Sequence, residues 1–238
     1  VRSRARFDET LGQRVVENAA LLDAGIGVER QKWVEFQHLP VIDRIGVAPQ
    51  PADLGGGLGI DYGHHIPPNP HDYAAIVAET VGDLGCTLMF EPGRYVAGPA
   101  GVLLTEIVYI KETETRSFAI VDAAMNDLVR PAMYEAHHEI MSVRAPSVED
   151  TSRDYDIVGP VCETGDTFAT QRALPALAAG ELVVVRDAGA YGAVMASGYN
   201  SRPLIAEVLV RGDSFSVVRA RQDIAAMLAQ ESLADWQT

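Results

Sequence analysis

A glycine cluster is the first of five segments whose residue types could do chemistry. It reads Asp53-Leu54-Gly55-Gly56-Gly57-Leu58-Gly59-Ile60. Four glycines within five positions let a ligand approach the backbone closely, and they let successive N–H groups converge on an anion. The cluster therefore predicts a phosphate cradle, and a flexible turn between a strand and a helix is the alternative reading of the same residues.

A second segment, Glu91-Pro92-Gly93-Arg94, puts a carboxylate and a guanidinium into one loop. A carboxylate can hold a protonated ring nitrogen, and a guanidinium can bind a phosphate or a carboxylate through two parallel hydrogen bonds. In isolation, such a Glu and Arg would form an ordinary surface ion pair. The segment gains meaning only together with the others.

Three more segments place reactive side chains beside glycine or proline. They are residues 126–134 with Arg130 and Tyr134, residues 162–166 with Cys162 and Glu163, and residues 187–193 with Tyr191. Binding and catalytic residues concentrate on loops of this kind between strands. Taken singly, Tyr191 could be a core aromatic residue and Cys162 a small buried one.

The elements that must position these loops change in character along the chain. Apolar spacing predicts helices over residues 7–22, 72–84 and 223–230, the last with Met227 and Leu228 as anchors, and a buried strand over residues 86–90. Residues 28–50 show no steady period. Short runs rich in β-branched residues predict strands over residues 102–111, 118–123, 155–160, 181–186, 205–210 and 215–218. We therefore expect an α/β part followed by an all-β part.

Length and charge exclude several classes of protein. The 238 residues carry 47% hydrophobic residues, enough for one large domain or two smaller ones. The net charge of −14 argues against a nucleic-acid-binding protein, and every long apolar run is interrupted, so we expect no membrane span. Two cysteines and no signal sequence favour a cytoplasmic protein. We expect no metal site.

Four of these motifs, in this order, resemble those of the diaminopimelate decarboxylases. The motifs are DLGGGLGI, EPGR, GPVCETGD and GAYGAVMASGYNSRP, and the resemblance runs from about residue 51 to residue 238. It implies a fold-type III pyridoxal-phosphate enzyme, in which a (β/α)₈ barrel precedes an antiparallel β-barrel or sandwich domain. Residues 51–100 would be the last units of that barrel, residues 101–238 the β domain with a C-terminal helix, and residues 1–50 an unmatched, partly helical segment.

The resemblance also implies roles for individual residues. Pyridoxal 5′-phosphate would be bound by Gly55, Gly56, Gly57, Glu91, Gly93, Arg94 and Tyr191. Glu91 would pair with the pyridine nitrogen. The substrate would be held by Arg94, Arg130, Tyr134, Glu163 and Tyr191, with Glu163 recognising the distal ammonium. Cys162 would be the proton donor, delivered across the interface of a homodimer.

The reaction implied is the decarboxylation of meso-2,6-diaminopimelate to L-lysine and carbon dioxide, a step of lysine biosynthesis. The CETGD and GAYGAVMAS segments favour this substrate over those of the related ornithine and arginine decarboxylases. A ring nitrogen kept protonated by Glu91 lets the cofactor accept the electrons left by the departing carbon dioxide. A thiol such as that of Cys162 is a suitable proton donor for the last step.

Two family features have no counterpart in the chain. Its only lysines, Lys32 and Lys111, lie outside any motif of the Schiff-base lysine, and we expect Lys111 on a solvated strand face. None of the six histidines stands where the family places a ring-stacking histidine, and the pairs at 64–65 and 137–138 read as surface or loop residues. A complete barrel needs about 250 residues. We therefore expect a truncated chain that is inactive alone, a non-catalytic partner or regulatory relative, or an unstable remnant.

Overall fold

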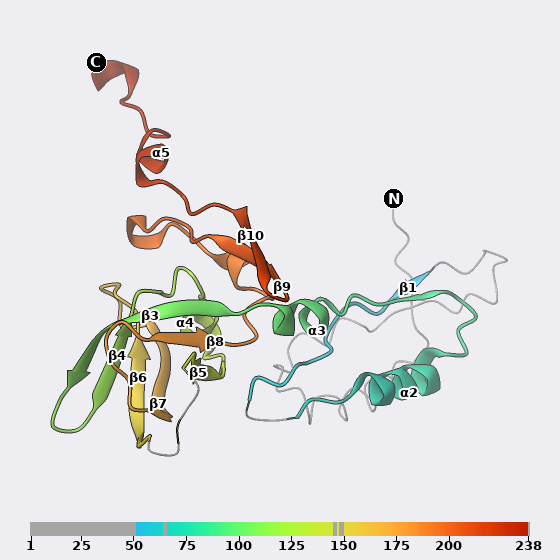
Figure 1. The fold of residues 1–238 in the computed structure, drawn as a ribbon. Helices are drawn as coiled ribbons and strands as arrows, with labels where there is room; N and C mark the ends of the chain where they lie inside the picture. Colours follow the sequence, from blue (N-terminus) through green and yellow to red (C-terminus); the bar gives the residue numbers. More distant parts are fainter. Residues whose placement is uncertain (1–50, 64–65, 145–146, 148–149, 238) are drawn as a thin grey trace. The chain divides into compact units, whose positions relative to one another are not determined.

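The computed structural model describes residues 51–63, 66–144, 147 and 150–237 (Figure 1). The chain divides into two compact units, Val1–Pro99 and Ala100–Thr238, and each is described by itself. The helix predicted over residues 7–22 and the aperiodic residues 28–50 lie outside the described residues. Among those described, no helix is long and apolar enough to cross a membrane.

The first unit contains a strand, a helix and a second strand that pairs in parallel with the first. β1 (Ala52–Asp53) pairs with β2 (Leu88–Met89), and α2 (Pro70–Val81) connects them. The Asn69 side chain caps α2 by accepting hydrogen bonds from the backbone N–H groups of His71 and Asp72, at 2.8 and 3.0 Å. The helix predicted over residues 72–84 is thus confirmed, and it begins two residues earlier and ends three earlier.

The buried strand predicted over residues 86–90 is wrong in length and in burial. Only the two residues of β2 are extended, and Met89 and Phe90 are 50% and 44% exposed. The apolar run has no longer strand to pair with, because β1 is also only two residues long. α3 (Gly93–Ala97) and the 3₁₀ turn η4 (Gly98–Ala100) follow the loop after β2.

The second unit is built on a curved six-stranded sheet. Its strands are β3 (Leu103–Glu112), β4 (Ser117–Val121), β5 (Ile140–Ser142), β6 (Ser152–Val158), β7 (Thr167–Pro175) and β8 (Leu182–Val185). Their order is β5-β8-β3-β4-β6-β7. The two edge strands, β5 and β7, also contact each other, so the sheet curls into a barrel-like shape (Figure 1). Inward side chains such as Ile107, Val121, Tyr155 and Val183 form the core.

The expectation of an antiparallel β domain is confirmed for every pair of strands in this sheet except one. β4 and β6 run parallel, with Ala119 opposite Ile157, whereas the other pairs of this sheet are antiparallel. A parallel pair needs a long connection that returns the chain to the same edge. Here that connection passes through α4 (Arg130–Tyr134) and β5, which is where predicted site residues lie.

Two strands of the sheet were not predicted from the sequence. β5 has three residues, too few to show a period. β7 has nine, but Gln171 has a φ of 48° and the pairing with β6 shifts register nearby. Such a bulge breaks the alternation of buried and exposed residues by which a strand is recognised. The predicted strands over residues 102–111, 118–123, 155–160 and 181–186 are confirmed as β3, β4, β6 and β8.

The end of the chain forms a separate hairpin and a short helix. β9 (Glu207–Arg211) and β10 (Ser214–Arg219) pair with each other, and α5 (Ile224–Leu228) follows, so the two strands and the last helix predicted here are confirmed. Leu228 was expected to anchor this helix by packing against the rest of the protein, but its side chain is 62% exposed. The 3₁₀ turns η5 (Ala193–Met195), η6 (Tyr199–Ser201) and η7 (Asp235–Gln237) complete the described elements.

Candidate active site

In the first unit, the glycine cluster and the loop containing Glu91 lie side by side. The backbone N–H of Glu91 donates a 2.7 Å hydrogen bond to the carbonyl oxygen of Gly55. A Cβ atom at Gly56 would lie 2.7 Å from the carbonyl oxygen of Glu91, so only glycine permits this approach. The contact arises because β1 and β2 are parallel, and the loops that follow parallel strands leave the same edge.

The backbone of this region leaves room for a bound group. Gly55 and Gly57 have φ angles of +67° and +99°, which disfavour any side chain. A Cβ atom at Gly55 or at Gly93 would meet nothing within 4 Å, so open space adjoins both backbones. Arg94, half-buried in α3, follows Gly93 directly. The N–H of Gly55 donates to Oδ1 of Asp53 at 2.8 Å and that of Gly93 to the carbonyl oxygen of Glu91 at 2.7 Å. The Arg94 guanidinium is therefore the group beside this open space that suits an anion.

In the second unit, a buried carboxylate joins two of the predicted site loops. Asp166, 3% exposed, accepts hydrogen bonds from the backbone N–H groups of Met125 and Val161, at 2.7 and 2.8 Å. Val161 precedes Cys162, and Met125 lies in the loop that leads from β4 to Arg130. Asp166 lies in the GPVCETGD motif, but the sequence alone predicted no role for it. An Asp that follows a glycine turn and opens a strand was the available signal.

A polar network holds the last motif, GAYGAVMASGYNSRP, to the loop of Asn126. The Asn126 side chain donates to the carbonyl of Ser197 at 3.1 Å and accepts from Nε of Arg202 at 2.9 Å. Arg202 also donates to the carbonyl of Asp122 at 2.6 Å and lies 3.5 Å from the carboxylate of Asp127. Burial raises the pKa of Asp127, and the Ala124 N–H and Arg202 oppose that rise.

A buried histidine that was not among the predicted site residues contacts Arg130. Arg130 is 7% exposed, and its Nη1 lies 2.9 Å from Nε2 of His138, which is fully buried. His138 was predicted to be a surface or loop residue; it lies in the loop between α4 and β5, but it is not at the surface, because both ring nitrogens have partners inside the protein. Nδ1 of His138 lies 2.8 Å from the carbonyl oxygen of Arg186. Burial lowers the pKa of His138 to about 4.

Other predicted side chains of this unit lie on exposed loops. Tyr134 and Tyr191 are 59% and 45% exposed, and Cys162 and Glu163 are also exposed. The hydroxyl of Tyr199 lies 3.5 Å from Oε2 of Glu163, which links the loop of Cys162 to η6. Both described cysteines are free.

The backbone of Tyr191 has a left-handed conformation, which is rare for residues other than glycine. Its φ is 58°, and a Cβ atom on the following Gly192 would collide with the carbonyl oxygen of Ala188. The same hypothetical atom would contact Leu128, so the loop of Tyr191 lies against the segment that leads to α4. The structure thus brings together the loops of Arg130, Cys162, Glu163 and Tyr191 in one unit, and those of Gly55–Gly57, Glu91, Gly93 and Arg94 in the other.

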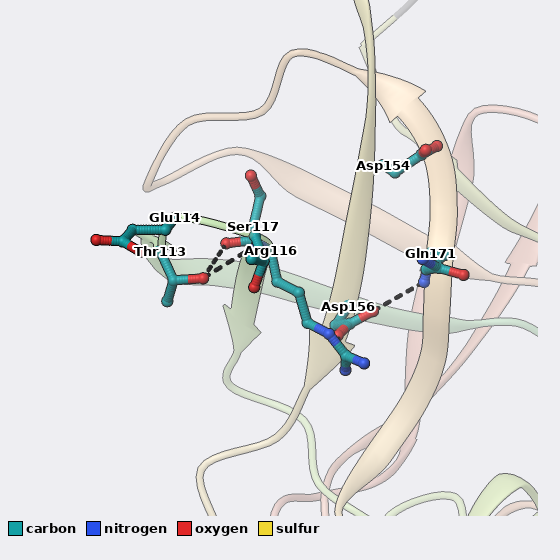
Figure 2. A pocket seen from close by; sticks show the side chains of 8 residues that line it. Thr113, Glu114, Arg116, Ser117, Asp154, Asp156 and Gln171 are labelled. Atoms are coloured by element: carbon teal, nitrogen blue, oxygen red, sulfur yellow. Dashed lines mark hydrogen bonds and ion pairs between the residues drawn. The ribbon is translucent and has the colours of Figure 1, made fainter.

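A polar pocket lies at the turn between β3 and β4, away from these loops in the sequence (Figure 2). It has a volume of about 280 Å³, and residues 113–117, Asp154, Asp156 and Gln171 line it. Asp156 accepts from Arg116 at 3.0 Å and from the backbone N–H of Gln171 at 2.8 Å. None of the predicted site residues lines it.

Neither lysine occupies a site position that the structure describes. Lys111 lies on β3 opposite Phe118 and is exposed, as predicted, and Lys32 lies outside the described residues. Among the described residues, no group of three or more His, Cys, Asp or Glu side chains could hold a metal ion.

Comparison with known proteins identifies the family. Residues 39–189 match the pyridoxal-dependent decarboxylase family in its C-terminal sheet domain. The chain is 50% identical over 198 residues to a diaminopimelate decarboxylase of Pseudomonas fluorescens and 45% identical over 203 residues to that of Zymomonas mobilis. This chain belongs to the diaminopimelate decarboxylase family. The matches cover 82% and 84% of the chain but only 47% and 48% of those relatives, so it spans about half their length.

Solved structures agree with this family assignment. The diaminopimelate decarboxylase from Helicobacter pylori complexed with L-lysine is 30% identical, with a TM-score of 0.74 over 95% of this chain and 52% of that one. AQ1208 from Aquifex aeolicus is 33% identical, with a TM-score of 0.76 over 95% of this chain. A lysine/ornithine decarboxylase from Vibrio vulnificus, at 21% identity, shares the fold. The six-stranded sheet is thus the C-terminal sheet domain of this family.

Proposed function

We propose that this chain is the later half of a pyridoxal-phosphate-dependent decarboxylase that converts meso-diaminopimelate to L-lysine and carbon dioxide in the cytoplasm. Residues 51–100 would be the last units of its (β/α)₈ barrel, and residues 101–238 its β domain. The observation that carries the proposal is the joining of three motif loops by Asp166, Asn126 and Arg202. Those loops contain every substrate-binding residue that the resemblance assigns to the second unit.

The residues of the first unit fit a pyridoxal phosphate. Open space adjoins the backbones of Gly55 and Gly93, and Arg94 follows Gly93, so a phosphate would lie against glycine backbone beside a guanidinium. Glu91, whose backbone contacts the glycine cluster, supplies a carboxylate for the pyridine nitrogen. When bound, the cofactor supplies an electron sink for the bond that releases carbon dioxide.

The residues of the second unit would bind and protonate the substrate. Arg130 and Tyr134 would hold a substrate carboxylate, and Glu163 the distal ammonium, which together select a side chain that ends in a zwitterion. Cys162 would donate its proton to the carbon atom that has lost carbon dioxide, leaving a thiolate that takes a proton back from solvent. Its exposure suits delivery into a site shared by a homodimer, as the family resemblance implies.

A hybrid enzyme tests the proposal directly. Residues 51–238 would be joined to the part of the Pseudomonas fluorescens relative that this chain does not match, which supplies the Schiff-base lysine. We expect the hybrid to release carbon dioxide from meso-diaminopimelate and to form L-lysine only when pyridoxal phosphate is present. A hybrid that folds and binds the cofactor but turns over ornithine or arginine instead would refute the substrate assignment.

A second candidate function is that of a non-catalytic partner of an active decarboxylase. The exposed position of Lys111, far in sequence from every motif, favours it for the chain alone. The chain would then show no visible absorption band of a lysine-bound cofactor, and it would co-purify with a full-length decarboxylase. A cofactor band in the purified chain would exclude this candidate.

A further inference from the structure

The hydrogen bonds around His138 determine the state of its ring. A guanidinium has only donors, so Nε2 of His138 must accept the hydrogen bond from Nη1 of Arg130. Nδ1 must then carry the hydrogen and donate it to the carbonyl oxygen of Arg186. Both bonds exist together only in the neutral Nδ1–H tautomer. The ring therefore acts as a fixed connector between Arg130 and the end of β8.

The backbone around His138 is held from two strands. Arg172 of β7 donates from Nη1 to the carbonyl oxygen of His138 at 2.9 Å, and the N–H of Arg186 donates to the carbonyl oxygen of Glu139 at 2.9 Å. Nη1 of Arg186 also lies 2.6 Å from Oε2 of Glu139. Because these bonds tie the backbone of residues 138–139 to β7 and to the residue after β8, the ring cannot shift without disturbing them.

A free arginine side chain has many rotamers, and selecting one of them costs conformational entropy when a ligand binds. We propose that His138 is a positioning residue for substrate recognition, because its buried ring holds the Arg130 guanidinium in the orientation that receives a substrate carboxylate. This inference rests on the proposed function, since that function assigns the carboxylate to Arg130. His138 itself contacts neither substrate nor cofactor in this role.

Two substitutions separate the two bonds of the ring. The amide nitrogen of Asn stands as far along its side chain as Nδ1 of His, so His138→Asn can keep the bond to Arg186 and loses the acceptor for Arg130. The amide oxygen of Gln reaches as far as Nε2, so His138→Gln can keep the bond to Arg130 and loses the donor. His71→Gln, at an exposed position on α2, is the control for removing a histidine.

The first measurement uses the intact 238-residue chain. We expect phenylglyoxal, an arginine-selective reagent, to modify Arg130 faster in His138→Asn and at the native rate in His138→Gln and His71→Gln, as followed by peptide mass. Nitrogen-detected NMR of the native chain should show the Nδ1–H tautomer at neutral pH. An Nε2–H tautomer or a charged ring would overturn the inference without any variant.

The second measurement uses the hybrid enzyme. We expect His138→Asn to raise KM for meso-diaminopimelate about 10- to 100-fold with a smaller change in kcat, as the loss of one hydrogen bond to a charged group implies. His138→Gln should stay near the native KM. Equal losses in both variants would overturn the inference, because the bond to Arg130 would then be irrelevant. If the native hybrid is inactive, the proposed function fails, and the labelling and NMR results still decide the role of His138.

Discussion

Acid should destabilise the second unit through His138. Its folded pKa is about 4, below the ordinary value of 6.5, because burial disfavours the charged ring. Arg130, His137 and Arg172 face it with positive charge and add to that effect, whereas the Arg186 carbonyl opposes it. The unfolded chain therefore binds a proton more readily than the folded one. The stability due to this group is complete above about pH 6.5 and is lost as the pH falls through 6.5 toward 4.

The size of the loss follows from the two pKa values. The difference between the pKa of 6.5 in the unfolded chain and about 4 in the folded one corresponds to about 3 kcal/mol when both states are fully protonated. At about pH 5 the linkage relation gives a loss of about 2 kcal/mol relative to about pH 7.5. Protonation also puts a hydrogen on Nε2, which removes the bond from Arg130.

Hydrogen exchange of the β3 and β8 amides measures the loss of stability in the second unit alone. A measurement on one unit is needed because the chain has two compact units. Opening free energies, corrected for the intrinsic exchange rate, would be compared at the two pH values for the native chain, His138→Gln and His71→Gln. We expect the native chain and His71→Gln to lose about 2 kcal/mol more than His138→Gln. An equal loss in all three would refute the assignment of acid sensitivity to His138.

Three further substitutions test the loops of the candidate site. Asp166→Asn replaces a buried carboxylate that accepts two backbone hydrogen bonds, so we expect the free energy of unfolding to fall by about 1–3 kcal/mol. The Met125 and Val161 amides should exchange faster, and unchanged exchange of both would contradict the role of Asp166 in joining the two loops. Gly192→Ala should lower the melting temperature, because its Cβ would collide with Ala188, whereas Gly165→Ala, where contacts are ordinary, should not. In the hybrid, Cys162→Ala should lower kcat about 100-fold or more with little change in KM, and full activity would exclude the thiol as proton donor.

Much of the secondary structure could be predicted from local patterns. The helix at residues 72–84 and the longer strands show the periods of a helix and of a half-buried strand, so α2, β3 and β6 were found. β7 was missed because the bulge at Gln171 interrupts its alternation. The prediction that residues 86–90 are buried was wrong, because burial depends on which elements pack against a strand. An apolar run alone does not say which elements do so.

The sequence by itself indicated the family and predicted which side chains react, because glycine, cysteine and charged loop motifs keep their spacing along the chain. Only the tertiary structure decided how those loops are held together. Asp166 joins residues 41 and 5 positions away, and Arg202 reaches residues 76 and 80 positions away. His138 shows the same difference, since the two adjacent histidines were predicted to be surface or loop residues and His138 is fully buried. The buried ring has Arg130 as the partner of one nitrogen and the carbonyl of Arg186 as the partner of the other. Only the fold brings these two residues, far apart in the sequence, to the same ring.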